Sequence, residues 1–246
     1  MRILYFDYET TGANVEIDRP VETGFCLWDC ETNQPLLVES LFLYADDYPP
    51  MQPEALKIHG ISKEILDEFS QSPKQVYLRL EEVVSKYKPS FMVGHNCTGF
   101  DLPIFMNDLK RLGLELPNVQ ALKWIDTQLH LPEYGRSKAL NYIAADLGFI
   151  NPFKHRAALD CLTGCLVLSH YDINEVVKIS QTPKVRLRGR LQPGEPEFEK
   201  KKSWLKERRY SWNGELKYWE KDFMETGVDQ EKDEAQKQGI RLIISI

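Results

Sequence analysis

The stretch FDYETTG, residues 6–12, ends an apolar run that starts at the N-terminus and predicts a strand over residues 2–9. Successive side chains of a strand point to opposite faces, so Asp7 and Glu9 are expected side by side on one face. Two carboxylates that close repel each other unless a positive charge lies between them. The sequence around this pair must therefore explain what holds the two acids together.

The order of the remaining elements predicts the fold class. Two more strands are expected over residues 22–29 and 36–44, and their short connection predicts an antiparallel meander. Helices are then expected over residues 53–69 with a break at Gly60, over 72–87 with Ser72 as N-cap, and over 102–113, 138–149 and 156–171. Short strands at residues 91–96 and 121–127 alternate with them. This order predicts an α/β fold in which a mixed sheet is flanked by helices.

The composition changes near Gln181. Residues 179–202 are basic, rich in proline and glycine and without apolar periodicity, which predicts a linker. The expected domains are therefore residues 1–178 and a small α+β module at 203–246. Asn213-Gly214 predicts a hairpin in the module, followed by a charged helix and a final strand at 240–246. A core of this size is marginal, so we expect the module to dock on the first domain or on a partner.

Charge is unevenly distributed along the 246 residues. The net charge of −6 by itself argues against an anionic partner, but twelve Lys or Arg stand against six Asp or Glu between Lys184 and Lys221. The sequence has no apolar run long enough to span a membrane, and its five cysteines are not needed as staples. These features predict a soluble cytoplasmic protein with reduced cysteines and no membrane partner.

Two further stretches place acids where apolar residues would be expected. Asp101 follows a buried strand in HNCTGFD, residues 95–101, and Asp160 lies in an apolar helix after HRAAL, residues 155–159. Each acid has a simpler interpretation: Asp101 as a helix N-cap, Asp160 paired with Arg156, and Asp7 with Glu9 as a solvated strand end. Together they favour convergence on divalent cations, and a ligand set of oxygens suits Mg²⁺ or Mn²⁺ better than zinc.

The motifs FDYETTG, HNCTGFD and HRAALD, in this order, resemble the three exonuclease motifs of the DnaQ-like superfamily of 3′-to-5′ exonucleases, in its DEDDh branch. The resemblance covers about residues 2–170 and implies a ribonuclease H-like fold. The ending HRAALDC and the small C-terminal module are similar to exodeoxyribonuclease X. The longer spacing within HNCTGFD, followed by LPIF, is more similar to the eukaryotic TREX exonucleases.

The resemblance also implies roles for individual residues. Asp7, Glu9, Asp101 and Asp160 would hold two Mg²⁺ or Mn²⁺ ions, and His155 would be the general base. Five residues along a helix correspond to about 500°, so His155 is expected in the loop or first turn before the helix of Asp160 and need not be a ligand. An imidazole in that position can take up a proton at physiological pH.

Contacts with the terminal nucleotide are expected around the same motifs. The polar candidates are Thr10, Thr11, His59 and Asn96, and the apolar surfaces for a base are Leu56, Ile61 and Phe100. His95 is expected to anchor the turn after its strand. In the basic C-terminal part, Trp204, Tyr210, Trp212, Tyr218 and Trp219 offer two interpretations of equal weight: faces on which bases stack, or the core of the module beneath a solvated charged surface.

The leading hypothesis is a metal-dependent exonuclease that degrades DNA from its 3′ end to nucleoside 5′-monophosphates, as in DNA repair. One alternative is a 3′-to-5′ exoribonuclease, because the same five residues serve both substrates. A second is an accessory protein of a polymerase that binds nucleic-acid ends. The expected partners are nucleic-acid 3′ ends, and a homodimer or a polymerase or repair partner remains open.

Overall fold

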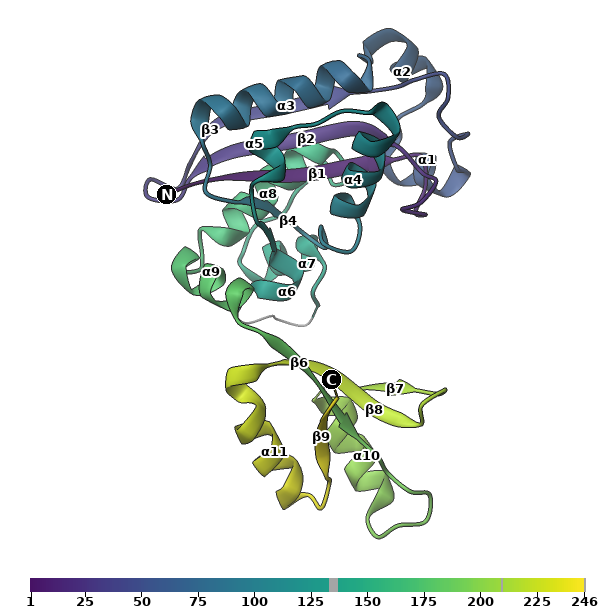
Figure 1. Cartoon of the computed structure of the whole chain (residues 1–246), viewed down its shortest axis with the longest axis vertical. Helices are drawn as coiled ribbons and strands as arrows, with labels where there is room; N and C mark the ends of the chain where they lie inside the picture. The colour runs from purple at the N-terminus through teal and green to yellow at the C-terminus, as the bar shows by residue number, and fades with distance from the viewer. Residues whose placement is uncertain (133–136, 209, 246) are drawn as a thin grey trace. The chain divides into compact units, whose positions relative to one another are not determined.

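The computed structural model describes residues 1–132, 137–208 and 210–245, apart from the side chains of Met224 and Thr226. The chain divides into two compact units, Met1–Ser180 and Gln181–Ile246 (Figure 1). Each unit has its own sheet and its own hydrophobic core. In the described part of the chain, no helix combines the length and apolar character needed to cross a membrane.

A mixed five-stranded sheet forms the centre of the first unit. Its strands are arranged in the order β3-β2-β1-β4-β5, with β2 antiparallel to both of its neighbours and β4 and β5 parallel to β1. The bounds are β1 Arg2–Thr10, β2 Pro20–Asp29, β3 Gln34–Phe42, β4 Met92–Gly94 and β5 Trp124–Asp126. The prediction of a meander followed by α/β alternation is confirmed.

The alternation of side chains along β1 separates the two faces of this sheet. Leu4 and Phe6 belong to a core completed by α3 (Pro73–Tyr87) and α4 (Asp101–Leu112), whereas Ile3 and Tyr5 pack against the opposite helices. Those opposite helices are α7 (Leu140–Asp146), α8 (Ala157–Leu168) and α9 (Ile173–Gln181). Asp7 and Glu9 continue the series of Ile3 and Tyr5, so they extend toward the side of the sheet that α8 covers.

Two glycines allow α8 to approach the sheet closely. A Cβ atom on Gly24 of β2 would lie 2.1 Å from the backbone carbon of Ala157, and one on Gly164 would lie 2.1 Å from Cζ of Tyr5. Only residues without a side chain fit at these two positions. The first turn of α8, which carries Asp160, is therefore held directly against β1 and β2.

Short helices surround this framework. Helices α1 (Pro53–His59) and α2 (Lys63–Phe69) are separated at Gly60, whose φ of 70° is in the left-handed region that favours glycine. Ser72 caps α3 through a capping box, as expected. Two single-turn helices, α5 (Pro117–Gln120) and α6 (Thr127–His130), flank β5 in the chain.

The second unit has a four-stranded antiparallel sheet in the order β7-β8-β6-β9. Its elements are β6 Lys184–Gly189, α10 Phe198–Glu207, β7 Ser211–Asn213, β8 Tyr218–Met224, the 3₁₀ turn η1 Glu225–Gly227, α11 Val228–Lys237 and β9 Leu242–Ser245. The predicted hairpin, helix and final strand are present. The hairpin loop spans residues 214–217 and is therefore longer than the two-residue turn typical of Asn-Gly.

The structure corrects the boundary predicted between the domains. Residues 184–202 are not a linker, because β6 is an inner strand that pairs with both β8 and β9. Leu187 of β6 and Leu205 of α10 are buried in the core of the second unit. The alternating pattern KVRLRG was masked in the sequence by its three charges and by the prolines that follow it.

Candidate active site

The acids of the three sequence motifs line one cavity of about 390 Å³ in the first unit. Asp7 and Glu9 extend from β1, Asp101 is the first residue of α4, and Asp160 lies in the first turn of α8. His155, in the loop before α8, lines the same cavity. Residues more than 150 positions apart in the chain are thus brought to one place by the packing of α4 and α8 beside β1.

Three of these side chains approach one another closely. One potential ligand atom each of Glu9, His155 and Asp160 lies within 4.8 Å of the other two. His155 adopts a left-handed φ of 63°, and its backbone N–H donates to Oδ2 of Asp160 at 2.8 Å. The loop before α8 therefore bends back onto the acid of its own helix, which holds the imidazole beside Asp160.

Asp160 is held by hydrogen bonds and not by an ion pair with Arg156. Its Oδ1 atom accepts a hydrogen bond from the Asn151 side chain at 2.7 Å. Arg156 instead binds Glu22 of β2, with Nε 3.1 Å from Oε2, and the backbone N–H of Ala157 donates to the same carboxylate. The simpler interpretation of Asp160 as half of a pair with Arg156 is therefore wrong.

Asp101 is almost completely buried and is tied to β1. Its Oδ1 atom accepts a hydrogen bond from the backbone N–H of Tyr8 at 3.0 Å. Burial raises the pKa of Asp101 to about 7, although this hydrogen bond acts in the opposite direction. Phe100, and not Asp101, is the N-cap residue of α4, so capping does not explain the acid at this position.

The electrostatics of the cavity fit a divalent cation. Within the described residues, the carboxylates of Asp7 and Glu9 accept no hydrogen bond and form no ion pair. Burial, followed by the charges of neighbouring acids, raises the pKa of Asp7 well above its usual range and that of Glu9 to about 8. Such acids need positive charge to stay ionised near neutral pH, and carboxylate oxygens are suitable ligands for Mg²⁺ or Mn²⁺.

The family model RNase_T, described as Exonuclease, matches residues 4–168 of the chain. The chain belongs to this exonuclease family. The matched span contains all three acidic motifs, so the predicted relationship to DEDDh exonucleases is confirmed at the level of the superfamily. No curated protein matches the chain.

Solved exonuclease structures share the fold of this family member. A zinc-bound complex of E. coli exonuclease I with single-stranded DNA has a TM-score of 0.61 at 18% identity, over 77% of this chain and 48% of that one. The complex of E. coli exonuclease I with a dT13 oligonucleotide has a TM-score of 0.59 at 18% identity, with the same coverage. This exonuclease-family chain spans about half the length of those structures.

The nuclease domain of 3′hExo, named as a DEDDh family member and bound to rAMP, is matched over most of its length. It has a TM-score of 0.59 at 15% identity and covers 69% of this chain and 90% of that domain. At these identities the likeness establishes the fold. The predicted ribonuclease H-like mixed sheet is thereby confirmed.

Four of the predicted substrate contacts line the cavity of the exonuclease domain: Thr10, His59, Asn96 and Phe100. The other three, Thr11, Leu56 and Ile61, are not among the lining residues. Thr11 is buried and its hydroxyl donates a hydrogen bond to Asp18 at 2.9 Å. Ile61 is buried in a small core that also contains Leu66 of α2. Leu56 is partly exposed on another side of α1.

Helix α1 supplies wall residues that the sequence interpretation missed. Glu54, Ala55 and Ile58 line the cavity, with Gln52 just before the helix. Their spacing of three and four residues would have identified this face of α1, because such residues share one side of a helix. Leu56 and Ile61 were expected to offer apolar surfaces at the cavity. Ile58, which is 56% exposed, lies there instead.

His59 holds α1 against the end of β1. The backbone N–H of Ile61 donates to Nδ1 at 2.9 Å, so the ring hydrogen is on Nε2, which lies 3.2 Å from the carbonyl oxygen of Thr10. Burial lowers the pKa of His59, which favours this neutral form. His59 thus lines the cavity while both of its ring nitrogens contact the protein backbone.

Asp126, at the end of β5, organises the second motif and was also missed. It accepts hydrogen bonds from the backbone N–H groups of Asn96 and Thr98 and from the Thr98 hydroxyl. These bonds fix the turn in which Asn96 has a φ of 60°. His95 anchors the same turn, as expected, through Thr127 Oγ1 and the carbonyl oxygen of Lys138. The sequence places Asp126 at the end of a predicted strand, but nothing local distinguishes it there from other acids at strand ends.

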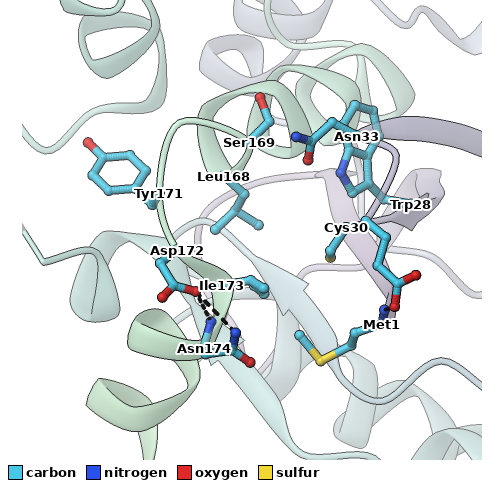
Figure 2. A pocket seen from close by; sticks show the side chains of 11 residues that line it. Met1, Trp28, Cys30, Asn33, Leu168, Ser169, Tyr171, Asp172, Ile173 and Asn174 are labelled. Atoms are coloured by element: carbon cyan, nitrogen blue, oxygen red, sulfur yellow. Dashed lines mark hydrogen bonds and ion pairs between the residues drawn. The ribbon is translucent and has the colours of Figure 1, made fainter.

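A second cavity of about 390 Å³ in the first unit does not have this chemistry. Figure 2 shows residues that line it, among them Met1, Trp28, Cys30 and Asp172. The Asp172 carboxylate accepts hydrogen bonds from the backbone and side-chain nitrogens of Asn174 (Figure 2). The Asp172 carboxylate thus binds the first turn of α9. No residue of the three motifs lines this cavity.

Proposed function

We propose that the chain is a metal-dependent 3′-to-5′ exonuclease that hydrolyses DNA and releases nucleoside 5′-monophosphates. The observation that carries this proposal is the convergence of Asp7, Glu9, Asp101, Asp160 and His155 on one cavity. Membership of the exonuclease family supports the reaction class. An end-binding accessory protein would not need the complete set.

The residues of the cavity divide the work of hydrolysis. Divalent cations held by the four carboxylates would activate a water molecule and stabilise the leaving 3′ oxygen. His155 accepts the proton that the attacking water releases, and its left-handed backbone and hydrogen bond to Asp160 hold it at the site. Ile58 and Phe100 offer apolar surfaces to the terminal base.

Membership of the exonuclease family does not distinguish DNA from RNA as the substrate, so the proposal of DNA needs further support. The titles of the exonuclease I complexes name single-stranded DNA and dT13, whereas that of the 3′hExo nuclease domain names rAMP. Similarity to exodeoxyribonuclease X, through HRAALDC and a small second unit, supports DNA as the substrate. A cytoplasmic location, a role in repair and a polymerase or repair partner stay predictions from the sequence.

Product analysis tests this proposal directly. Single- and double-stranded DNA and RNA, labelled at either end, would be incubated with the protein and Mg²⁺ and the products sized. We expect mononucleotides released from the 3′ end of DNA, with RNA degraded more slowly. Faster release from RNA would favour the exoribonuclease, and binding of ends without hydrolysis would favour the accessory protein.

A matched pair of variants assigns the activity to this cavity. Asp160→Asn retains the size of the side chain and removes one charge, and we expect it to lower turnover at least a hundredfold, as removal of transition-state stabilisation does. Asp222→Asn makes the same change in an exposed ion pair of the second unit and should leave turnover unchanged. Equal activity of the two variants would contradict the assignment.

A further inference from the structure

The second unit contains a cleft of about 670 Å³ that the proposed active site does not use. Its walls come from the loop after β6, one face of α10 and the hairpin of β7 and β8. The lining residues that carry chemistry are Arg190, Phe198, Lys202, Lys206, Trp212 and Lys217. No Asp or Glu is among the residues that line it.

One aromatic ring of the cleft, that of Trp212, does not belong to the core of the unit. Trp204 and Tyr210 stack at 6.4 Å between ring centroids and pack within the core of the unit, as one interpretation of the sequence had it. Trp212 differs, because it is 49% exposed and lies 5.6 Å from the largely buried ring of Trp219. The two indole planes are tilted by 53°, so Trp219 contacts Trp212 at one side and leaves the half-exposed indole as a flat surface for stacking.

The cationic side chains of the cleft are available to a ligand. Lys206 and Lys217 are exposed and form no ion pair with any described residue. Arg190 lies over the ring of Tyr218 at 5.8 Å, and the ammonium of Lys202 lies over the ring of Phe198 at 5.7 Å. The one ion pair of Lys202 among the described residues, with the exposed Glu199 at 3.4 Å, is of a kind that contributes little. The second unit has fifteen Lys or Arg and twelve Asp or Glu, so it is net positive in a chain that is net negative.

From these features we propose that the cleft binds single-stranded DNA through a segment that is separate from the 3′ end being hydrolysed. Phosphates would contact the lysines and Arg190, and unpaired bases would stack on Trp212. A single strand fits better than a duplex, because paired bases do not expose their faces to a half-buried indole. The choice of DNA as the nucleic acid rests on the proposed function.

Helix α10 provides a matched pair of substitutions. Phe198, Lys202 and Lys206 are four residues apart and lie along one face of the helix, which lines the cleft. Lys200 is displaced by about 160° from the direction of their midpoint, Lys202, and lies on the outer side, where it contacts Glu197. Lys206→Glu and Lys200→Glu change the charge of the unit equally and only the first alters the cleft.

Binding without hydrolysis provides the test. Anisotropy of a labelled oligothymidylate of about 20 nucleotides would be measured for the full chain in EDTA. We expect Trp212→Ala to raise the Kd about 5- to 150-fold, which is the loss of stacking by about one base. Lys206→Glu should also weaken binding and reduce its dependence on salt, whereas Lys200→Glu and Trp212→Phe should bind nearly as the wild type does.

Different outcomes distinguish this proposal from the proposed function. If DNA ends are degraded while Trp212→Ala and Lys206→Glu bind the oligonucleotide like the wild type, the cleft proposal is overturned and the exonuclease stands. If no nucleic acid is degraded but both variants lose affinity, the exonuclease proposal is overturned and the cleft proposal stands. Loss of binding to an acidic peptide in these variants, without any effect on DNA, would overturn the proposal in favour of a protein partner.

Discussion

The guanidinium of Arg156 binds the buried carboxylate of Glu22, and not Asp160 one turn further along α8. Glu22 also accepts a hydrogen bond from the backbone N–H of Ala157, so one acid on β2 receives both the side chain and the start of the helix. Arg156 therefore does not neutralise the charge of Asp160. Because Glu22 anchors the start of α8, it also fixes the position of Asp160 in the first turn of that helix.

Glu22→Gln should therefore destabilise the fold where α8 meets β2. Loss of the charge-assisted bonds at a buried site is expected to lower the free energy of unfolding by about 1.5–3 kcal/mol, measured by urea denaturation. The same change in the exposed pair of Arg186 and Asp222, Asp222→Asn, should cost less than about 1 kcal/mol. Equal effects of the two variants would mean that Glu22 does not anchor α8.

Gly24→Ala tests the close approach of α8 to the sheet. The added methyl group would lie 2.1 Å from the Ala157 backbone, which no rotamer change can relieve, so α8 must shift. We expect a loss of about 1–3 kcal/mol in unfolding free energy, together with reduced turnover because Asp160 moves. Gly214→Ala is the control: its added methyl group would lie 3.8 Å from the Trp212 side chain, an ordinary contact, so this variant should unfold as the wild type does.

Much of this site could be predicted from sequence because its chemistry is unusual for its surroundings. Acids in an apolar strand, at a loop-helix junction and in an apolar helix are each costly to bury, so Asp7, Glu9, Asp101 and Asp160 can be recognised from the sequence as candidates for a shared site. The order of strands and helices was equally readable, because apolar periodicity along the chain specifies it.

The parts that were missed depend on contacts between distant segments. Glu22 and Asp126 act through residues 134 and 30 positions away, and no local pattern distinguishes them from other acids of strand ends. The orientation of α1, which brings Ile58 and not Leu56 to the cavity, is set by the hydrogen bonds of His59. The strand β6 was missed because its charged residues, followed by prolines, made this part of the sequence look like a linker. Only the pairing with β8 and β9 shows that it is an inner strand.

The pH dependence of stability should reflect the buried acids. The pKa values of Glu9 and Asp101 are raised to about 8 and about 7 by burial, and those of unfolded carboxyl groups are near 4. Protonation therefore stabilises the folded state below the unfolded pKa, and this contribution is lost as pH rises through 7 and 8. Without divalent cations, the Tm should fall between about pH 5.5 and 8.5.

Two comparisons assign that fall in Tm to the cavity. Glu9→Gln cannot ionise, so the Tm of this variant should decrease less steeply over the same pH range. Excess Mg²⁺ should raise the Tm of the wild type most at the alkaline end, because a bound cation offsets the charges that appear there. A Tm that is independent of Mg²⁺ throughout this range would contradict cation binding by these carboxylates.

His155 can be assigned by separating metal binding from turnover. Its ring lies within 4.8 Å of ligand atoms of both Glu9 and Asp160, so geometry alone allows an imidazole ligand as well as a proton acceptor. For a proton acceptor, His155→Ala should lower turnover about 10²- to 10⁴-fold while Mn²⁺ still raises the Tm as in the wild type. Asp160→Asn should lose both responses if Asp160 is a metal ligand, as proposed. A His155→Ala protein whose Tm no longer responds to Mn²⁺ would instead place the imidazole among the metal ligands.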